Sequence, residues 1–238
     1  MGWSAAQAVA AHRPEDVIRA YLRLDRVAEL KPMLGVMARQ RRAYHVVDDA
    51  ELEAVSSSVH HEGVCLLVRP RAPAPLSALR DAHRDGAAVR ALFLAGVENP
   101  NNVGAIVRSA AHFGARWILT DGASEAARTS AAIRTAEGGM EHVAFVPLEH
   151  VEAELAGLRN AGVALVATSS RARRSLFVAP LPRSAVFMMG AERDGLPPAL
   201  TSLATHPLEI PGTGAVESLN VSTAAAIFLA EHWRTYGS

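Results

Sequence analysis

The sequence is poor in several features, and each shortage excludes a class of protein. Cys65 is the only cysteine among 238 residues, which excludes an intramolecular disulfide framework and a CxxC metal site. No apolar run approaches the roughly 20 residues of a membrane-spanning helix. The N-terminus shows neither a signal peptide nor a myristoylation signal. We therefore expect a cytosolic chain without disulfides.

The overall charge does not indicate a class of partner. The net charge is zero, so the composition does not favour a generally basic nucleic-acid binder, although a local patch could still hold phosphates. Lys31 is the only lysine, and arginine supplies the other basic side chains. Arginine suits bidentate phosphate contacts, but a genome rich in G and C produces the same bias. Half of the residues are hydrophobic, which is enough for a sizeable core.

The clearest internal boundary lies at residues 70–88. Residues 69–75 are rich in proline and lack periodicity, and residues 81–86 are polar. We interpret 70–88 as a linker, extended in its first half, between a small α/β domain at 1–69 and a larger domain at 89–238.

The small domain shows short periodic patterns. Apolar residues recur at helical spacing over 27–37, and Pro32 should break this run into two helices. Asp48 or Asp49 could cap a further helix that runs through Leu52 and Val55. Two β-like runs lie on either side of it, at 44–47 and 64–68.

Beyond the linker, strand-like and helix-like segments alternate regularly. The predicted strands cover six apolar runs, at 89–95, 117–120, 143–146, 163–168, 186–189 and 207–210. The predicted helices cover 102–113, 148–161 and 219–233. Continuous apolar strands that alternate with helices indicate an α/β fold, with a parallel sheet covered on both faces.

Asparagines precede the first helix of the larger domain. Asn102 and the asparagines at 99 and 101 surround Pro100 and suit a turn with a helix cap. Arg108 follows one turn after Gly104, so its side chain should lean back over a position without a side chain and bring its guanidinium close to the cap asparagines. A phosphate or sugar oxygen at the helix N-terminus would gain from this guanidinium. An ordinary capped helix with a solvated arginine is the alternative.

A glycine-bounded turn follows the strand predicted over 186–189. Gly190 and Gly195 enclose Glu192, and ligands of open α/β sheets bind at this carboxyl edge. Glycine permits a positive φ or a close backbone approach to a ligand. In isolation, a plain surface turn with a solvated glutamate is the better explanation.

The third motif is an irregular glycine-containing loop, 210–214, followed by Ser218 and Asn220. It fails as a dinucleotide-binding fingerprint because Glu217 replaces the third glycine, and no P-loop pattern occurs in the chain. No GxSxG surrounds Ser218, so an acyl-transfer nucleophile is not indicated. We interpret Ser218 and Asn220 as hydrogen-bonding groups at a helix start.

Two features of the small domain could suggest a metal site or a nucleophile, but the sequence supports neither. The segment His60-His61-Glu62-Gly63 is not HExxH and has no clustered partners, so a turn explains it better than a metal site. The apolar neighbours of Cys65 predict a buried structural thiol rather than a nucleophile.

In this order, the three motifs of the larger domain resemble those of the SpoU/TrmH branch of the SPOUT RNA methyltransferases. The first is matched by Asn102, Gly104 and Arg108, and the second by Gly190, Glu192 and Gly195. The third is matched by Ile210, Pro211 and Ser218–Ser222, although Gly212 stands where the family usually has methionine. The small domain resembles the family's substrate-binding module, with His61-Glu62-Gly63 in place of a His-Gln-Gly turn.

The resemblance implies a fold, a cofactor and a reaction. The parallel sheet would carry helices on both faces and end in a C-terminal trefoil knot, an exception to the usual rule of unknotted chains. S-adenosylmethionine would be held in the knot of a homodimer, near backbone of Thr168, Gly190, Ile210 and Leu219. Its methyl group would pass to a ribose 2′-hydroxyl of structured rRNA or tRNA, with no metal and no membrane involved.

The resemblance also implies roles for side chains. Asn102, Glu192, Ser218 and Asn220 could position the ribose and its hydroxyl. Arg108 corresponds to the family's activating group. Because a guanidinium hardly deprotonates, stabilising the developing alkoxide with help from an RNA phosphate suits it better than acting as a base.

Three other functions stay open at this point. A catalytically idle RNA-binding or ribosome-assembly protein could share the fold, although the filled catalytic positions argue against it. A methyltransferase acting on a base nitrogen would not need the Asn102–Arg108 pair, and an unrelated nucleotide-binding α/β enzyme lacks its glycine signature. The arginines that could contact RNA, with a solvated surface as the default for each, are Arg39, Arg41, Arg42, Arg171, Arg173 and Arg174.

Overall fold

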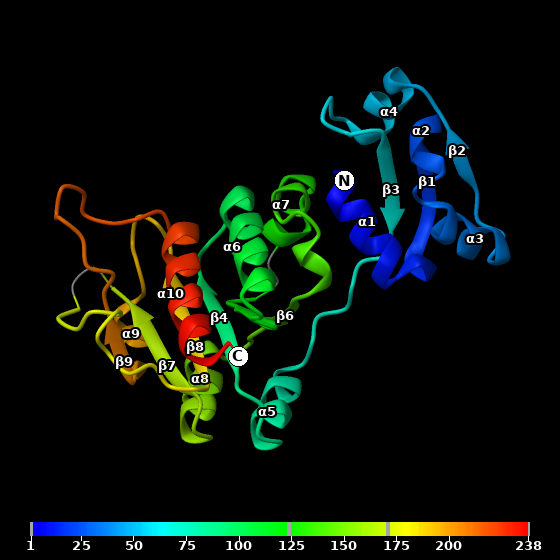
Figure 1. The fold of residues 1–238 in the computed structure, drawn as a ribbon. Coiled ribbons are helices and arrows are strands. Elements are labelled where there is room, and N and C mark those ends of the chain that lie inside the picture. The colour runs from blue at the N-terminus through cyan, green and yellow to red at the C-terminus, as the bar shows by residue number, and fades with distance from the viewer. Residues whose placement is uncertain (1, 123–124, 170–171, 238) are drawn as a thin grey trace.

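The computed structural model describes residues 2–122, 125–169 and 172–237 (Figure 1). The strands of this part of the chain form two sheets. The first has three strands in the order β2-β1-β3, and the second has six in the order β6-β5-β4-β8-β7-β9. The two sheets lie on either side of the segment predicted as a linker.

The small sheet is built around β1 (Val17–Leu22), which pairs in parallel with β2 (Tyr44–Val46) and antiparallel with β3 (Val64–Val68). Helices α1 (Trp3–His12) and α3 (Lys31–Arg39) bury one face of this sheet. The other elements of this part are η1 (Pro14–Asp16), α2 (Leu24–Val27) and α4 (Asp49–Ser56).

Several predictions for this part are confirmed. The helical run is interrupted between α2 and α3, with Pro32 in the first turn of α3, and the carboxylate of Asp48 caps α4 by accepting from the backbone N–H of Glu51 at 2.9 Å. The sequence did not predict α1 or the central strand β1. The prediction that Cys65 is buried was too strong, because its side chain is half-buried.

The large sheet contains only parallel pairs. Each predicted apolar run overlaps one of its strands. In sequence order they are β4 (Arg90–Ala95), β5 (Trp117–Thr120), β6 (Ala144–Pro147), β7 (Ala164–Thr168), β8 (Ala185–Gly190) and β9 (His206–Leu208). The prediction of a parallel sheet is therefore confirmed.

Helices cover both faces of the large sheet, as predicted. On one face α6 (Pro100–His112) and α10 (Val221–Tyr236) pack on Leu92 and Leu94 of β4. On the other face α5 (Leu76–Arg84), α8 (Val151–Asn160) and α9 (Pro198–Leu203) form a second core with Phe93. Three short helices complete the first face, namely η2 (Glu125–Arg128), α7 (Ser130–Thr135) and η3 (Gly139–Glu141).

The predicted linker is extended only in its first half. Residues 69–75 form no helix or strand, but the polar second half contains most of α5. Leu79 of α5 is fully buried in the second core of the large sheet. The sequence did not predict α5 because this helix is short and buries only a narrow apolar stripe among charged residues. No helix formed by the described residues is both long and apolar enough to cross a bilayer.

Helix α1 joins the two parts of the molecule (Figure 1). It packs on β3 and also on α7 and η3. At its C-terminal end, the Arg13 guanidinium donates to both carboxylate oxygens of Glu141, at 2.7 and 2.9 Å. Only 5 % of the Glu141 side chain is exposed, so this bidentate ion pair is shielded from solvent and fixes how α1 sits against η3.

A buried polar cluster anchors α10. The fully buried His232 accepts at Nδ1 a hydrogen bond of 2.8 Å from Nε of Arg90 and donates from Nε2 to the carbonyl oxygen of Pro182 at 3.0 Å. The hydroxyl of Tyr236 donates to the carbonyl oxygen of Leu181. Burial, together with the charge of Arg90, lowers the pKa of His232 to about 4. The imidazole is therefore neutral in the folded protein.

We expect this histidine to make the stability depend on pH. The unfolded chain takes up the proton near pH 6.5 and the folded chain only near pH 4, so the contribution is present above pH 6.5 and is lost as the pH falls to about 4. The shift corresponds to about 3 kcal/mol. His232→Gln keeps a donor and an acceptor but does not titrate, so its urea-unfolding free energy should fall less between pH 7 and pH 4.5 than that of the wild type.

The exposed His150 replaced by glutamine is the matched control, and it should keep the wild-type pH dependence. An equal fall in stability for His232→Gln and the wild type would contradict the assignment of this titration to His232.

Candidate active site

The carboxyl ends of β4 and β8 form the edge at which the motif residues meet. The two strands are paired in parallel, with Ala95 opposite Gly190. Helix α6 starts soon after β4, and the Gly190–Gly195 turn follows β8 directly. Because parallel strands place their carboxyl ends at one edge, Asn102 and Glu192 arrive together although 90 residues separate them.

A closed triangle of hydrogen bonds joins Asn102, Glu192 and Asn220. Nδ2 of Asn102 donates to Oε1 of Glu192 at 2.9 Å. Nδ2 of Asn220 donates to the same carboxylate oxygen at 2.5 Å and to Oδ1 of Asn102 at 3.1 Å. One residue from each of the three sequence motifs thus meets the others at a single point.

The start of α10 orients this triangle. Asn220 is the N-cap of the helix, and its Oδ1 accepts from the backbone N–H of Ser222 at 2.9 Å and from the Ser222 hydroxyl at 2.6 Å. Its amide nitrogen must therefore face Glu192. Within the described residues no hydrogen bond reaches Oε2 of Glu192, so this oxygen can accept a proton or a hydrogen bond from a ligand.

The motif glycines allow close packing of the chain on itself. A Cβ on Gly190 would collide with the backbone of Gly195 and Leu196, and Gly195 has φ +66°. A Cβ on Gly104 would lie 2.6 Å from the carbonyl oxygen of Ala132 in α7. The positive φ at Gly195 agrees with the prediction. The close neighbours of Gly104 are Ala132 and Thr135 of α7 rather than the Arg108 side chain.

Arg108 lies outside the triangle. Its side chain is exposed on α6, and within the described residues it makes no hydrogen bond or ion pair. The predicted approach of the Arg108 guanidinium to the cap asparagines is therefore not accompanied by a hydrogen bond between them within the described residues. Asn99, one of the asparagines predicted as caps, caps α6 by accepting from the backbone N–H of Asn101 at 2.9 Å. The guanidinium remains available to a ligand.

The residues expected near a cofactor lie at the ends of neighbouring strands. Thr168 ends β7, and its hydroxyl donates to the carbonyl oxygen of Met188 in β8 at 2.9 Å. Ile210 follows β9 and is half-buried against the core. The whole segment 211–220 is exposed, including Ser218, and Leu219 is 44 % exposed. Ser218 is not brought into the triangle.

Most of the candidate RNA-contacting arginines are exposed, and they do not form one cluster along the chain. Arg42 differs, because its guanidinium donates to the carbonyl oxygens of Glu15 and Val17 and so supports the local fold. Arg171 lies outside the described residues. The exposed ones are Arg39, Arg41, Arg173 and Arg174.

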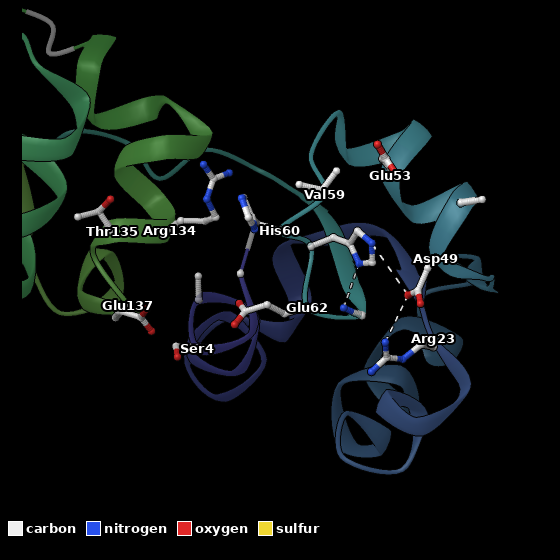
Figure 2. Close-up of a pocket in the computed structure, with 15 residues that line it drawn as sticks. Ser4, Arg23, Asp49, Glu53, Val59, His60, Glu62, Arg134, Thr135 and Glu137 are labelled. Carbon is white, nitrogen blue, oxygen red and sulfur yellow. Dashed lines mark hydrogen bonds and ion pairs between the residues drawn. The ribbon is translucent and has the colours of Figure 1, made fainter.

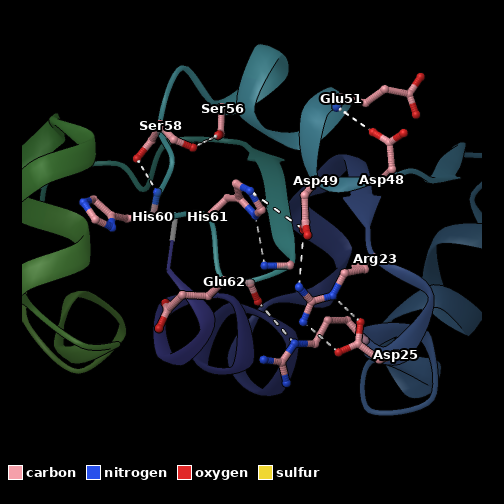
Figure 3. Close-up of polar contacts among 12 residues, drawn as sticks. Arg23, Asp25, Asp48, Asp49, Glu51, Ser56, Ser58, His60, His61 and Glu62 are labelled. Atoms are coloured by element: carbon pink, nitrogen blue, oxygen red, sulfur yellow. Dashed lines mark hydrogen bonds and ion pairs between the residues drawn. The ribbon is translucent and has the colours of Figure 1, made fainter.

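The segment 60–63 forms a turn before β3, as predicted (Figure 3). Nδ1 of His61 accepts from the backbone N–H of Gly63 at 3.1 Å, and Nε2 lies 4.0 Å from Oδ1 of Asp49. Glu62 and Gly63 both have positive φ, +52° and +80°. Oε2 of Glu62 accepts from the backbone N–H of Trp3 at 2.6 Å, so the carboxylate caps the start of α1. Among the described residues no group of three potential ligands could hold a metal ion.

Sequence reasoning missed the contribution of α7. Arg134 and Thr135 of this helix line a cleft that also contains the 60–63 turn (Figure 2). The hydroxyl of Thr135 lies 3.5 Å from Oδ1 of Asn101, next to the triangle. No sequence signal marked α7, because it is only six residues long and follows no strand directly.

Comparison with known proteins decides the family. Residues 90–230 match the SpoU rRNA Methylase family, and residues 1–74 match the family described as RNA 2′-O ribose methyltransferase substrate binding. The chain belongs to the SpoU rRNA methylase family. All three motifs of the candidate site lie within the matched SpoU region.

Individual relatives of this SpoU chain carry methyltransferase names. The uncharacterized tRNA/rRNA methyltransferase YfiF of Escherichia coli O157:H7 is 39 % identical over 98 % of this chain and 67 % of its own length. The 23S rRNA (guanosine-2′-O-)-methyltransferase RlmB of Vibrio vulnificus is 29 % identical over 97 % and 94 %. The AdoMet-bound rRNA methyltransferase of Sinorhizobium meliloti, 22 % identical, has the same fold, with a TM-score of 0.77 over 98 % of this chain and 84 % of its own.

Gly190→Ala should destabilise this SpoU chain, because the new Cβ meets the backbone of Gly195 and Leu196. We expect a loss of about 1–3 kcal/mol, or a displaced turn that carries Glu192 away from the asparagines. Gly212→Ala is the matched control, since nothing lies within 4 Å of that position. Thermal unfolding of both variants checks this, and equal melting temperatures would contradict the close approach.

Proposed function

We propose that the protein is an S-adenosylmethionine-dependent methyltransferase that methylates a ribose 2′-hydroxyl of rRNA or tRNA. The hydrogen-bonded triangle of Asn102, Glu192 and Asn220 is the observation that carries this proposal. It presents amide groups and a free carboxylate oxygen at the carboxyl edge of the sheet, which suits a ribose hydroxyl better than an apolar group. The name of the Vibrio relative favours rRNA as the substrate class.

The cofactor would lie along the ends of β7, β8 and β9. Thr168, Gly190, Ile210 and Leu219 are the residues that would hold it, and the half-exposed Leu219 offers an apolar surface for an adenine ring. Backbone groups at these strand ends would bind its polar edges. When bound, S-adenosylmethionine supplies an electrophilic methyl group on a sulfonium.

The side chains of the site would orient the ribose and assist loss of the hydroxyl proton. Oε2 of Glu192 can accept a hydrogen bond from the hydroxyl, while the two asparagines hold the carboxylate in place. Ser218, exposed before α10, would contact the ribose. Arg108, with an exposed guanidinium, would stabilise negative charge on the oxygen and bind a neighbouring phosphate.

The proposal includes a trefoil knot in a homodimer. The segment 172–184 contacts both the end of β9, through the bridge of Ser175 with Glu209, and α10, through Pro182 and His232. This arrangement suits a C-terminal segment threaded through a loop. Exposed apolar side chains suit a partner subunit. They are Phe177, Val178, Val216 and Trp233.

We further propose three parts for the chain and a cytoplasmic location. Residues 1–69 would form the RNA-binding domain and residues 89–238 the methyltransferase domain, with 70–88 joining them through α5. Cytoplasmic action follows from the proposed rRNA or tRNA substrate.

Nucleoside mass spectrometry tests the reaction. Purified protein is incubated with isotopically labelled S-adenosylmethionine and RNA from cells lacking the gene, with ribosomal and transfer fractions kept apart. Label on one 2′-O-methylated nucleoside is expected and identifies the RNA class and base. Label on a base would overturn the proposed chemistry. No label from protein that binds RNA but not the cofactor would favour a catalytically idle RNA-binding protein.

Arg108→Ala should reduce kcat by about 100-fold, the size of losing one transition-state donor. Because Arg108 has no internal partner among the described residues, stability and cofactor affinity should stay close to those of the wild type. Arg159→Ala, at an exposed arginine of α8, is the matched control and should keep full activity. Single-turnover methylation and calorimetric cofactor titration measure these quantities, and an unchanged kcat would remove Arg108 from the site.

A further inference from the structure

A cleft of about 880 Å³ separates the small sheet from α7 (Figure 2). One wall comes from the N-terminal part of the chain and includes Arg23, Asp49 and the 60–63 turn. The other wall comes from α7 and the turn after it, through Arg134, Thr135 and Glu137. The Arg13–Glu141 ion pair and the packing of α1 on η3 hold the two walls together.

Several charged groups of the cleft are already paired. Arg23 binds Asp25 at 2.6 Å and Asp49 at 3.3 Å (Figure 3). Glu62 accepts from the backbone N–H of Trp3, and His61 is held by Gly63. These groups therefore shape the wall, and their hydrogen-bonding capacity is largely used within the protein.

Arg134 and His60 differ from these groups. Within the described part of the chain, neither the Arg134 guanidinium nor the His60 ring makes a hydrogen bond or an ion pair. They enter the cleft from opposite walls (Figure 2), and both also line the adjoining cavity beside β3. Two sets of unused N–H donors that face the same space suit an anionic group bound between them.

The cleft is connected to the candidate active site through α7. Thr135 follows Arg134, and its hydroxyl lies 3.5 Å from Oδ1 of Asn101, the neighbour of Asn102. Close packing at Gly104, which has no room for a Cβ beside Ala132 and Thr135, keeps α7 against α6. The α7 wall of the cleft therefore lies against the N-terminal part of α6, the helix that carries Asn102.

We infer that this cleft binds a nucleotide of the RNA substrate outside the methylated one, with Arg134 and His60 holding its phosphate from opposite walls. Carboxylates at the rim, Glu53 and Glu137, disfavour a bare polyanion but can accept hydrogen bonds from the N–H edge of a base. The inference rests on the proposed function, because it assigns the cleft to the same RNA.

The test measures RNA binding by the full chain separately from methylation. Filter binding uses the ribosomal and transfer RNA fractions of cells that lack the gene, at several salt concentrations. Arg134→Ala should weaken binding roughly three- to tenfold and lower the salt slope by about 0.7–0.9, the contribution of one phosphate contact. His60→Ala should weaken binding less in the Arg134→Ala background than in the wild type, because both residues hold one phosphate.

Arg159→Ala is the matched control, with an arginine in the last turn of α8 as Arg134 is in the last turn of α7. It should leave affinity and slope unchanged, and all variants should bind S-adenosylmethionine as the wild type does. The inference is overturned if the wild type binds and methylates RNA but Arg134→Ala and His60→Ala bind it equally well, or if their effects simply add. A wild type that binds neither RNA fraction would instead overturn the proposed function.

Discussion

The parallel pairing of β4 with β8 is the constraint on which the candidate active site depends. Both strands are buried on both faces, so their register is set by two cores at once. A shift of one residue would move every side chain of a strand to the opposite face. With the register set, the two strand ends lie together, and the Asn102 helix and the Glu192 turn emerge at the same edge. The third partner, Asn220, arrives through the docking of α10.

Buried and exposed polar groups have different tasks in this fold. His232, Arg90 and Pro182 form a buried network that holds α10 against the sheet. At the opposite end of the same helix, Asn220 is exposed and shares its amide between the helix cap and Glu192. The first network positions the helix, and the second is therefore free to meet a substrate.

Helix α1 gives the N-terminal part its place relative to the site. Its start is capped by Glu62 and its end is tied to η3 by the Arg13–Glu141 pair. The first contact belongs to the small sheet and the second to the large one, so the helix couples the two. Because α1 holds the two parts together, the 60–63 turn and α7 form opposite walls of one cleft. Thr135 of α7 also lies 3.5 Å from Asn101, the residue before Asn102 of the triangle.

Local patterns in the sequence determined the six strands of the large sheet, the caps at Asp48 and Asn220 and the three polar motifs, because each depends on neighbouring residues alone. Tertiary structure decided the rest. β1 lacks a distinctive pattern and becomes a strand between two partners, while α7 forms on the surface of α6. The sequence suggested that the Arg108 side chain leans over Gly104, whereas Ala132 and Thr135 of α7 pack there. Gly190 allows the backbone of Gly195 and Leu196 to approach closely. Pairing between distant segments brought the amides of Asn102 and Asn220 to the carboxylate of Glu192 and set the two walls of the cleft opposite each other. Local sequence patterns carry no information about such pairing.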